Sequence, residues 1–435
     1  MKNSVKNLME FIDHSPSCFH VIDNARKQFM EHGFTELKEK EYWKLEEGKS
    51  YFVTRNGSSI IAFHLPKKDF KGFHIVASHS DSPTYRIKEQ PEIHVEKHYT
   101  KLNIERYGGM IPETWFDRPL SVAGRIIIEE SGQIKDQLFD VDRDLLIIPN
   151  LAIHMSRSSK DSKALNPQKD LLPLCGGDLS KDGFEEMIAK EAGVKKEDIL
   201  SYDLFLYNRM KGTTLGINEE FVAAPKLDDL ECAYSSIEGM LNAKLSKDYV
   251  TVCAVFDNEE VGSGTKQGAA STFLKDTLRR INDGLGRTYE EYLMTLADSF
   301  MISADNAHAL HPNYADMTDP VNHPLLNEGI VIKYNANQRY TTDAVSGAVF
   351  QAVCQAAGVP TQRYSNRADL PGGSTLGNIS TAHLSVPTVD IGLPQLAMHS
   401  VCETAGAADT DYLVKAIASY YACSFQQEAD GGITL

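Results

Sequence analysis

The hydrophobic pattern of this chain alternates between helix and strand periods. Val5, Leu8, Met9 and Ile12 are spaced like one face of a helix. Further helices are predicted over these segments: 18–32, 183–191, 343–357 and 411–425. Continuous apolar runs, typical of strands buried on both faces, cover these segments: 73–77, 249–256, 300–304, 329–334 and 387–391. Strands separated by helices imply a sheet with helices on both faces, and therefore an α/β protein.

The middle of the chain has a different texture. Over residues 91–223, short alternating segments such as 121–129 and 145–154 predict half-buried strands. With 435 residues, the chain is also too long for one ordinary core. We therefore predict a discontinuous domain formed by residues 1–90 and 224–435, interrupted by an inserted β-rich domain over residues 91–223.

Charge and cysteine content narrow the function classes. The formal net charge of −16 argues against binding to nucleic acid or to an anionic membrane. A preference for acidic substrates would need a local positive group. The seven cysteines form no C-x-x-C pair, which argues against a disulfide framework or a cysteine zinc site and favours a reducing, cytoplasmic compartment. The first residues carry no long apolar run, so neither a signal peptide nor a membrane-spanning segment is expected.

Carboxylates and histidines gather where the predicted strands end. In open α/β sheets, sites are built at the carboxyl ends of the strands. The side chains in such positions, or beside another apolar element, are His79, Asp81, Asp228, Glu259, Glu260, Asp305 and His399. Each is a weak signal by itself, because an Asp before a helix is usually an N-cap and a single histidine is usually a hydrogen-bonded core or surface residue. Together they predict one site.

Zinc chemistry needs these residue types together. Zinc binds His nitrogen and carboxylate oxygen, and in a two-metal site one carboxylate bridges the ions. His79 and Asp81 point to the same side of an extended segment, so Asp81 can fix the tautomer of His79. Glu259 and Glu260 point in different directions, so one can hold a metal while the other contacts its water. The pattern indicates metal-dependent amide hydrolysis. Zinc fits by ligand type, and cobalt or manganese could occupy the same ligands.

A competing mononuclear site uses the segment that follows residue 304. On a helix, Asp305, His308 and His311 would share one face and could hold a single ion. Pro312 requires any such helix to be short, so this alternative ligand set stays open beside the larger one.

The candidate residues lie within or beside eight motifs along nearly the whole chain. They are His79-Ser80-Asp81-Ser82-Pro83, Trp115-Phe116-Asp117-Arg118, Leu151-Ala152-Ile153-His154, Ala224-Pro225-Lys226-Leu227-Asp228, Glu259-Glu260-Val261-Gly262-Ser263, Ser303-Ala304-Asp305-Asn306-Ala307-His308, Asn335-Ala336-Asn337-Gln338-Arg339-Tyr340 and Pro394-Gln395-Leu396-Ala397-Met398-His399-Ser400. In this order they resemble the M18 family of metallopeptidases, the aspartyl aminopeptidases. The resemblance implies a zinc-peptidase-like α/β/α catalytic domain with an inserted β-rich dimerisation domain, and dimers that assemble into a dodecamer.

The resemblance also implies an activity and a set of metal ligands. The expected hydrolase is a zinc aminopeptidase that cleaves the first peptide bond of peptides with a free N-terminus and prefers N-terminal Asp or Glu. Each subunit would bind two zinc ions. The implied ligands are His79 and Asp305 for one ion, Glu260 and His399 for the other, and Asp228 as the bridge.

Five further residues receive roles from the same resemblance. Glu259 would be the general base for a water activated by the two ions, and Asp81 would orient His79. His154 would reach the site of a neighbouring subunit and stabilise the developing oxyanion. Lys333 would meet the acidic side chain of the substrate, with Arg339 as the fallback cation.

Two departures from the family pattern bear on substrate choice more than on the reaction. Leu227-Asp228-Asp229 stands where Leu-Asp-Asn is frequent, and Pro371-Gly372-Gly373-Ser374 stands where Pro-Cys-Gly-Ser is frequent. The first adds a negative charge beside the implied bridging ligand, and the second changes a glycine-rich turn. The alternatives are another two-metal amide hydrolase, such as a broad-specificity aminopeptidase or a deacylase, and a non-catalytic peptide-binding cage.

Overall fold

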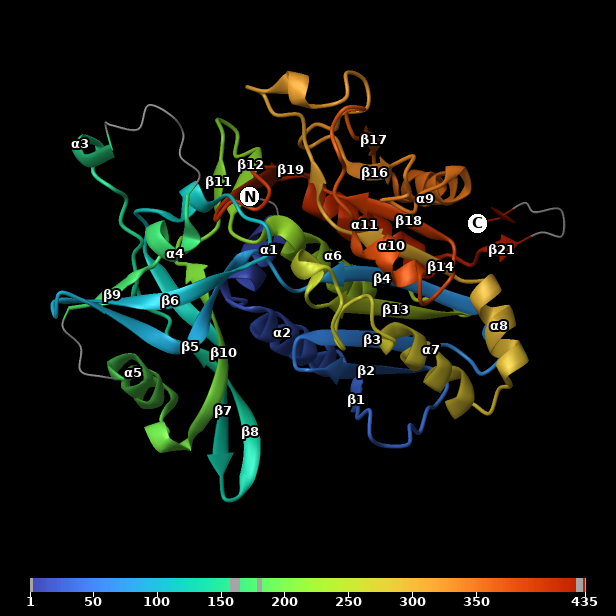
Figure 1. Cartoon of the computed structure of the whole chain (residues 1–435). Helices are drawn as coiled ribbons and strands as arrows, with labels where there is room; N and C mark the ends of the chain where they lie inside the picture. The colour runs from blue at the N-terminus through green and yellow to red at the C-terminus, as the bar shows by residue number, and fades with distance from the viewer. Residues whose placement is uncertain (1–2, 157–164, 178–181, 428–432, 435) are drawn as a thin grey trace.

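A large mixed sheet forms the centre of the protein. The computed structural model describes residues 3–156, 165–177, 182–427 and 433–434. Among them, nine strands form this sheet in the spatial order β1 (Thr35–Leu37), β2 (Lys49–Arg55), β3 (Ser59–Leu65), β13 (Tyr249–Phe256), β4 (Gly72–His79), β14 (Phe300–Ala304), β18 (Thr388–Gly392), β16 (Ile330–Tyr334) and β17 (Thr361–Ser365) (Figure 1). The four central strands, β13, β4, β14 and β18, are parallel. Their continuous apolar runs are buried on both faces, as predicted.

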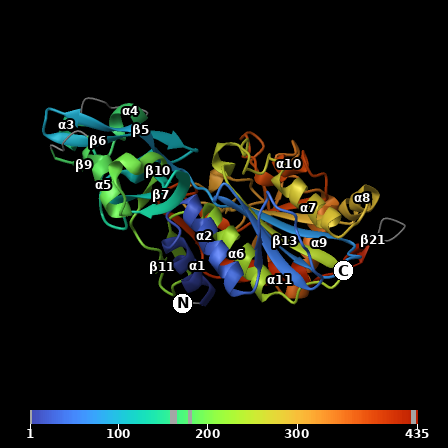
Figure 2. The same ribbon diagram turned by 90° about the horizontal axis from the view of Figure 1, so that it is seen from below.

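Helices cover both faces of this sheet (Figure 2). One face packs against α1 (Asn3–Asp13), α2 (Cys18–Glu31), α6 (Leu227–Asn242), α9 (Ala344–Ala357) and α11 (Asp409–Ala422). The other packs against α7 (Phe273–Gly284), α8 (Tyr289–Ala297) and α10 (Leu376–Thr381). Successive residues of β13 alternate between the two cores, because Cys253 and Val255 belong to the first while Val252 and Ala254 belong to the second. The α/β/α prediction is confirmed.

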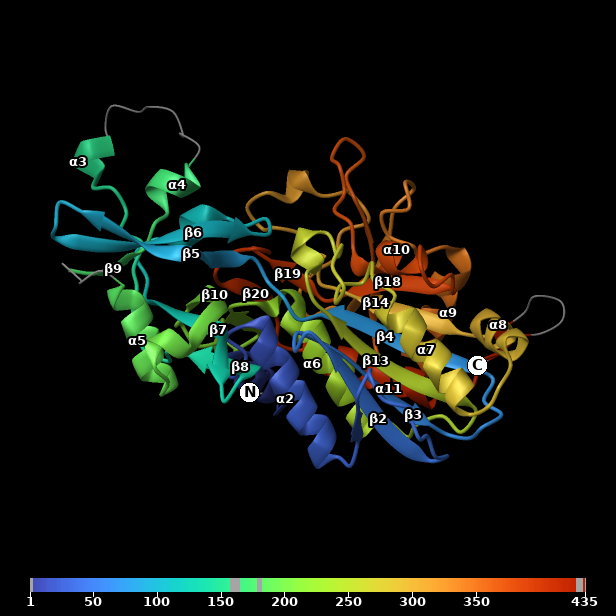
Figure 3. The same cartoon turned by 60° about the horizontal axis from the view of Figure 1, so that its bottom comes forward.

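A second, antiparallel sheet lies to one side (Figure 1). Within the described residues its order is β8 (Gln133–Asp140), β7 (Leu120–Glu130), β10 (Ile199–Asn208), β5 (Thr84–Val95), β6 (Tyr99–Tyr107) and β9 (Leu174–Gly176). It has its own hydrophobic core, to which α5 (Gly183–Ala192) contributes Phe184 and Ile188. The short helices α3 (Ile153–Ser156) and α4 (Pro167–Asp170) belong to the same part of the chain (Figure 3).

A third sheet connects the two parts. Its order is β11 (Thr213–Leu215), β12 (Phe221–Ala224), β20 (Glu403–Gly406), β19 (Pro394–Leu396) and β15 (Ala307–His308). The chain therefore enters the second sheet at Thr84, where β5 starts, and leaves it after Asn208, where β10 ends. The division of the chain at residues 91 and 223 stays a prediction about domains. A small pair, β21 (Gln426–Gln427) and β22 (Ile433–Thr434), lies near the C-terminus.

One strand prediction in the middle region is wrong. Residues 121–129 lie in β7, but residues 145–154 form only isolated bridges at Leu146 and Ile147 before α3 begins. Pro149 interrupts the segment, because it has no N–H to donate to a strand ladder. The alternating apolar side chains Leu151, Ile153 and Met155 are exposed in this chain.

The parallel register places the strand ends at one edge of the central sheet. Phe256 of β13 pairs with His79 of β4, and Ser303 of β14 pairs with Ala77 of β4. The residues that follow β13 and β14 therefore emerge beside the end of β4. None of the described helices has the length and apolar content needed to cross a membrane.

We predict that Gly392→Ala destabilises this edge. A methyl group at Gly392 would overlap the carbonyl oxygen of Asp305 and lie 2.8 Å from its carbonyl carbon, where β18 passes β14. We expect the free energy of unfolding to fall by about 1–3 kcal/mol, because the backbones must separate. Gly373→Ala is the control, since nothing lies within 4 Å of its added methyl group. Equal urea midpoints for the two variants would contradict the prediction.

Candidate metal centre

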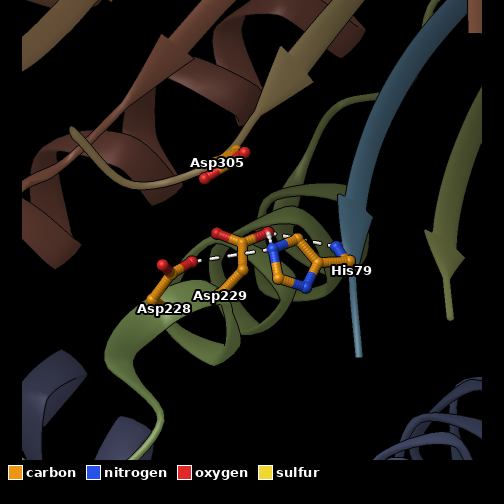
Figure 4. Close-up of side chains that lie close together, drawn as sticks. All are labelled: His79, Asp228, Asp229 and Asp305. Carbon is orange, nitrogen blue, oxygen red and sulfur yellow. Dashed lines mark hydrogen bonds and ion pairs between the residues drawn. The ribbon is translucent and has the colours of Figure 1, made fainter. Parts of the chain in front are cut away.

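Histidine and carboxylate side chains converge at the sheet edge. His79 ends β4, Asp228 and Asp229 lie at the start of α6, and Asp305 follows β14 (Figure 4). Among the described residues, three groups have ligand atoms within 4.8 Å of one another: His79 with Asp228, Asp229 and Asp305; His79 with Glu259 and Glu260; and Asp228 with Glu260 and His399. The structure therefore brings together all five of the implied metal ligands.

Hydrogen bonds fix the tautomer of His79. Its Nδ1 lies 3.1 Å from the backbone carbonyl oxygen of Asp81 and 3.3 Å from Asp81 Oδ1. Both partners are acceptors, so in the neutral imidazole the proton belongs on Nδ1 and the lone pair on Nε2. Burial lowers the pKa of this imidazole, but the surrounding Asp229, Asp228 and Asp81 carboxylates raise it well above its ordinary value. This Nε2 lies 3.6 Å from Asp228 Oδ1, on the side where Figure 4 shows the carboxylates. Asp81 contacts the His79 ring through both its carbonyl and its carboxylate oxygen, and its orienting role stays a prediction.

The Asp228 carboxylate lies between two histidines. Its Oδ1 faces His79, while its Oδ2 lies 3.4 Å from Nε2 of His399. The same His399 nitrogen lies 3.4 Å from Glu260 Oε2. A carboxylate whose two oxygens face two different donor groups has the arrangement that a bridging ligand needs.

Several carboxylate oxygens in this cluster are buried and have no hydrogen-bond partner among the described residues. Among the described residues, Asp228 Oδ1, Asp229 Oδ1 and Glu260 Oε1 accept no hydrogen bond. Burial raises the pKa of Glu260, and the neighbouring Asp228 carboxylate raises it further. Unpaired buried carboxylates cost free energy, and divalent cations remove that cost. The oxygen and imidazole donors fit zinc, so the cluster is suited to hold metal ions.

Glu259 lies beside this cluster. Burial raises its pKa to about 8, and the Asp305 and Asp81 carboxylates add to the rise against the opposing effect of His79. Its side chain belongs with His79 and Glu260 to the second of the three groups. A carboxyl group with a pKa near neutrality can exchange a proton with a reacting group.

The structure places the other predicted residues at different distances from the cluster. Lys333 is buried, with Nζ 3.8 Å from Asp305 Oδ1 and 5.4 Å from the centre of the Tyr340 ring. Arg339 is exposed and lines an open cavity of 680 Å³ between the loops that follow β16 and β17. His154 is exposed on α3, which lies away from β4 and α6 in this chain (Figures 1 and 3).

The competing site of Asp305, His308 and His311 does not form. The helix that it requires is absent, because residues 307–308 are the strand β15, which pairs with β19. Within the described part of the chain, Asp305 is grouped with His79 and the α6 carboxylates instead.

Comparisons with known proteins agree with this geometry. The family described as Aminopeptidase I zinc metalloprotease (M18) matches residues 11–421. A probable M18 family aminopeptidase 2 of Clostridium acetobutylicum is 46% identical over 434 residues, covering 97% of this chain and 100% of the relative. A protein of the same description from Pseudomonas aeruginosa is 38% identical, covering 96% of this chain and 98% of the relative.

The chain belongs to the M18 family of zinc metalloaminopeptidases.

Solved structures show the same fold. A chain in the cryo-EM structure of the Ape4 and Nbr1 complex superposes with a TM-score of 0.92 at 38% identity, covering 96% of this chain and 85% of that chain. A chain of the S. cerevisiae mApe1 dodecamer superposes with a TM-score of 0.84 at 26% identity, covering 96% of each chain. Both cover the central sheet and the second sheet of this M18 aminopeptidase together.

In this M18 aminopeptidase, Asp81 holds other residues of the site in addition to His79. Its Oδ1 accepts a hydrogen bond from the backbone N–H of Glu259 (3.1 Å), and its Oδ2 accepts one from that of Glu260 (3.2 Å). The hydroxyl of Tyr107 also donates to Asp81 Oδ2 (2.7 Å) and accepts from Asn258 Nδ2 (2.8 Å). Tyr107 ends β6, so the second sheet supports the metal cluster directly.

Three further residues at the site were missed as contributors. Tyr107 is distant in sequence from the strand-end motifs that pointed to the others. Asp229 had been noted only as an added charge, but its Oδ2 accepts the backbone N–H of His79 (3.0 Å). Glu403 accepts the backbone N–H groups of Asp228 (2.9 Å) and His399 (2.7 Å). Tyr107 acts through hydrogen bonds to residues distant in sequence, so no local pattern identifies it. Glu403 has one local partner, His399, and one distant partner, Asp228, and only the structure shows that it joins them.

We predict that Tyr107→Phe lowers kcat of the aminopeptidase by about 10-fold or more, because Asp81 loses the hydroxyl that helps to hold it. The measurement is steady-state peptide hydrolysis by the metal-loaded enzyme. Tyr202→Phe is the control, since its hydroxyl donates to the carbonyl of Lys88 (2.9 Å) within the second sheet. Both variants should lose about 1 kcal/mol of stability. A kcat that is equally preserved in both would show that Tyr107 has no positioning role.

Proposed function

We propose that this protein is a two-zinc aminopeptidase that releases N-terminal residues from peptides and prefers Asp and Glu. The observation that carries the two-ion part is the Asp228 carboxylate, with one oxygen toward His79 and the other toward His399 and Glu260. Family membership favours this function over a deacylase or a non-catalytic cage.

Five side chains would hold the ions in this proposal. They are His79 and Asp305 for one ion, Glu260 and His399 for the other, and Asp228 as the bridge. When bound, zinc supplies Lewis acidity that polarises the scissile carbonyl and makes water easier to deprotonate. The unpartnered buried oxygens of Asp228 and Glu260 support this assignment.

Glu259 would move the proton. It accepts a proton from the attacking water and returns it to the leaving amine nitrogen, as a general base and then a general acid. Its backbone is held by Asp81, whose other contacts keep His79 in the required tautomer. The free α-amine of the substrate would lie near the metal ions or an acidic group beside them.

A cation beside the cluster would select acidic side chains. The chain carries a net charge of −16, so an acidic residue needs a local positive group to approach. Lys333 is buried next to Asp305 and is therefore better placed for this role than the exposed Arg339. Arg339 would contact parts of the peptide farther from the cleaved bond.

Assembly would complete the site. His154 lies among the exposed apolar side chains Leu151, Ile153 and Met155, which a second copy of the chain could cover. In the proposed homo-oligomer, His154 then enters the site of the neighbouring subunit and stabilises the developing oxyanion. The similarity to a chain of the S. cerevisiae mApe1 dodecamer supports a dodecamer, for which we propose dimers as the building units.

We predict that Glu259→Gln lowers kcat by about 10²–10⁴-fold, because the amide cannot accept the proton. The assay compares release from peptides with N-terminal Asp, Glu, Leu, Lys or Ala. Zinc content measured on the same samples controls for metal loss and should stay at two ions per chain.

Chelation should abolish wild-type activity, and added zinc should restore it. Predominant release of neutral residues by the wild type would contradict the acidic preference while leaving the metal mechanism intact.

We also predict that Lys333→Met reduces kcat/KM for Asp and Glu peptides by about 10²-fold more than for Ala and Leu peptides, because a buried charge pair with the substrate is lost. Arg339→Gln is the matched loss of a positive charge at an exposed position, and it should change this ratio little. If Lys333→Met lowers kcat/KM equally for all peptides, Lys333 only stabilises Asp305 and does not contact the substrate side chain.

A further inference from the structure

A buried carboxylate joins two of the proposed metal ligands from behind. Glu403 begins β20 and is 2% exposed. Its Oε1 accepts the backbone N–H of His399 (2.7 Å), and its Oε2 accepts the backbone N–H of Asp228 (2.9 Å). These ligands come from different parts of the chain, because Asp228 lies in α6 while His399 lies in the loop between β19 and β20.

The backbone around His399 needs this support. His399 has a φ of 66°, in the left-handed region that residues other than glycine seldom adopt. Its carbonyl oxygen accepts the N–H of Ile111 (3.0 Å), so Glu403 and the loop after β6 hold the two sides of the same peptide segment. A different φ would turn the imidazole away from Asp228 and Glu260.

Glu403 acts through the ligands and not on the ions. Among the described residues, it belongs to none of the three groups whose side-chain atoms could hold a metal. Its two oxygens instead accept the N–H groups of His399 and Asp228, and a carboxylate is the side chain that offers two acceptors without a donor. We propose that Glu403 is a positioning residue that locks Asp228 and His399 in the arrangement required by one of the two zinc ions. The proposal rests on the two-zinc function given above.

The test replaces one acceptor. In Glu403→Gln, one oxygen remains, and the amide NH₂ must face the N–H of either Asp228 or His399. We expect the zinc ion shared by Asp228 and His399 to bind about 10–100-fold more weakly, because a ligand backbone is released. The other ion should weaken as well if the released backbone is that of the bridging Asp228. Titration of metal-free protein against a chromophoric zinc chelator measures both affinities without substrate, so the result does not depend on activity.

Asp409 provides a matched control, because it is another buried carboxylate that accepts two backbone N–H groups. Asp409 is 0% exposed, and its two oxygens accept the backbone N–H groups of Asn327 (2.7 Å) and Gly329 (3.1 Å). Asp409→Asn therefore introduces the same mismatch between two N–H groups away from the metal cluster. It should lower the melting temperature of the metal-free protein as Glu403→Gln does, and it should bind both ions with wild-type affinity.

Each outcome decides the proposal. Wild-type affinity for both ions in Glu403→Gln, or equal weakening in Asp409→Asn, overturns it. If Glu403→Gln does not fold, Glu403→Asp gives the same readout, since the shorter side chain keeps the charge but cannot reach both N–H groups. If the wild-type protein binds only one zinc ion, the two-zinc function is wrong, whatever the role of Glu403. The positioning role is then decided by comparing the affinity for that one ion between the wild type and Glu403→Gln.

Discussion

Mutual repulsion among buried carboxylates is the constraint on which the rest of this structure depends. Asp228, Asp229, Glu260 and Asp305 lie at one edge of the central sheet, and several of their oxygens accept no hydrogen bond among the described residues. Such an arrangement of ionised carboxylates is costly in the protein alone, and bound cations relieve that cost. The parallel strands provide the rigid frame, because the register of β4, β13 and β14 brings their carboxyl ends together.

Most residues of the cluster are held by hydrogen bonds from their backbone N–H groups to a nearby carboxylate. Asp81 accepts those of Glu259 and Glu260, Asp229 accepts that of His79, and Glu403 accepts those of Asp228 and His399. Each acceptor thus positions a neighbour in the cluster without using the neighbour's side chain. The side chains that face the metal site stay free to bind ions. The second sheet joins this network through Tyr107, so it supports the catalytic geometry as well as any assembly.

The parts of the site that could be predicted from the sequence are those encoded locally. Apolar runs identified the central strands, and polar residues at or just after the strand ends pointed to His79, Glu260 and Asp305, which the structure places in one cluster. The Asp305-to-His311 helix was wrong because β19, distant in sequence, pairs with that segment as a strand. Glu403 was missed because it lies 175 residues from Asp228, and a contact at that separation leaves no periodic signal. The strand expected over residues 145–154 failed where Pro149 interrupts it and where no other part of this chain covers its apolar side chains.

The same electrostatics gives a reason for the proposed acidic preference. Burial by itself lowers the pKa of Lys333, but Asp305, Tyr340 and Asp390 together outweigh this effect, raise the pKa above its usual value and keep the lysine charged. The ammonium lies 3.8 Å from Asp305 Oδ1, so in the protein alone the two charges compensate each other. If Asp305 serves as a metal ligand, its charge is shared with a cation and Lys333 loses part of its compensation, while the carbonyl oxygen of Asn306 still accepts a hydrogen bond from its Nζ. A buried ammonium that is only partly compensated would then favour a substrate that brings its own carboxylate, so metal binding and acidic specificity would be linked through Asp305.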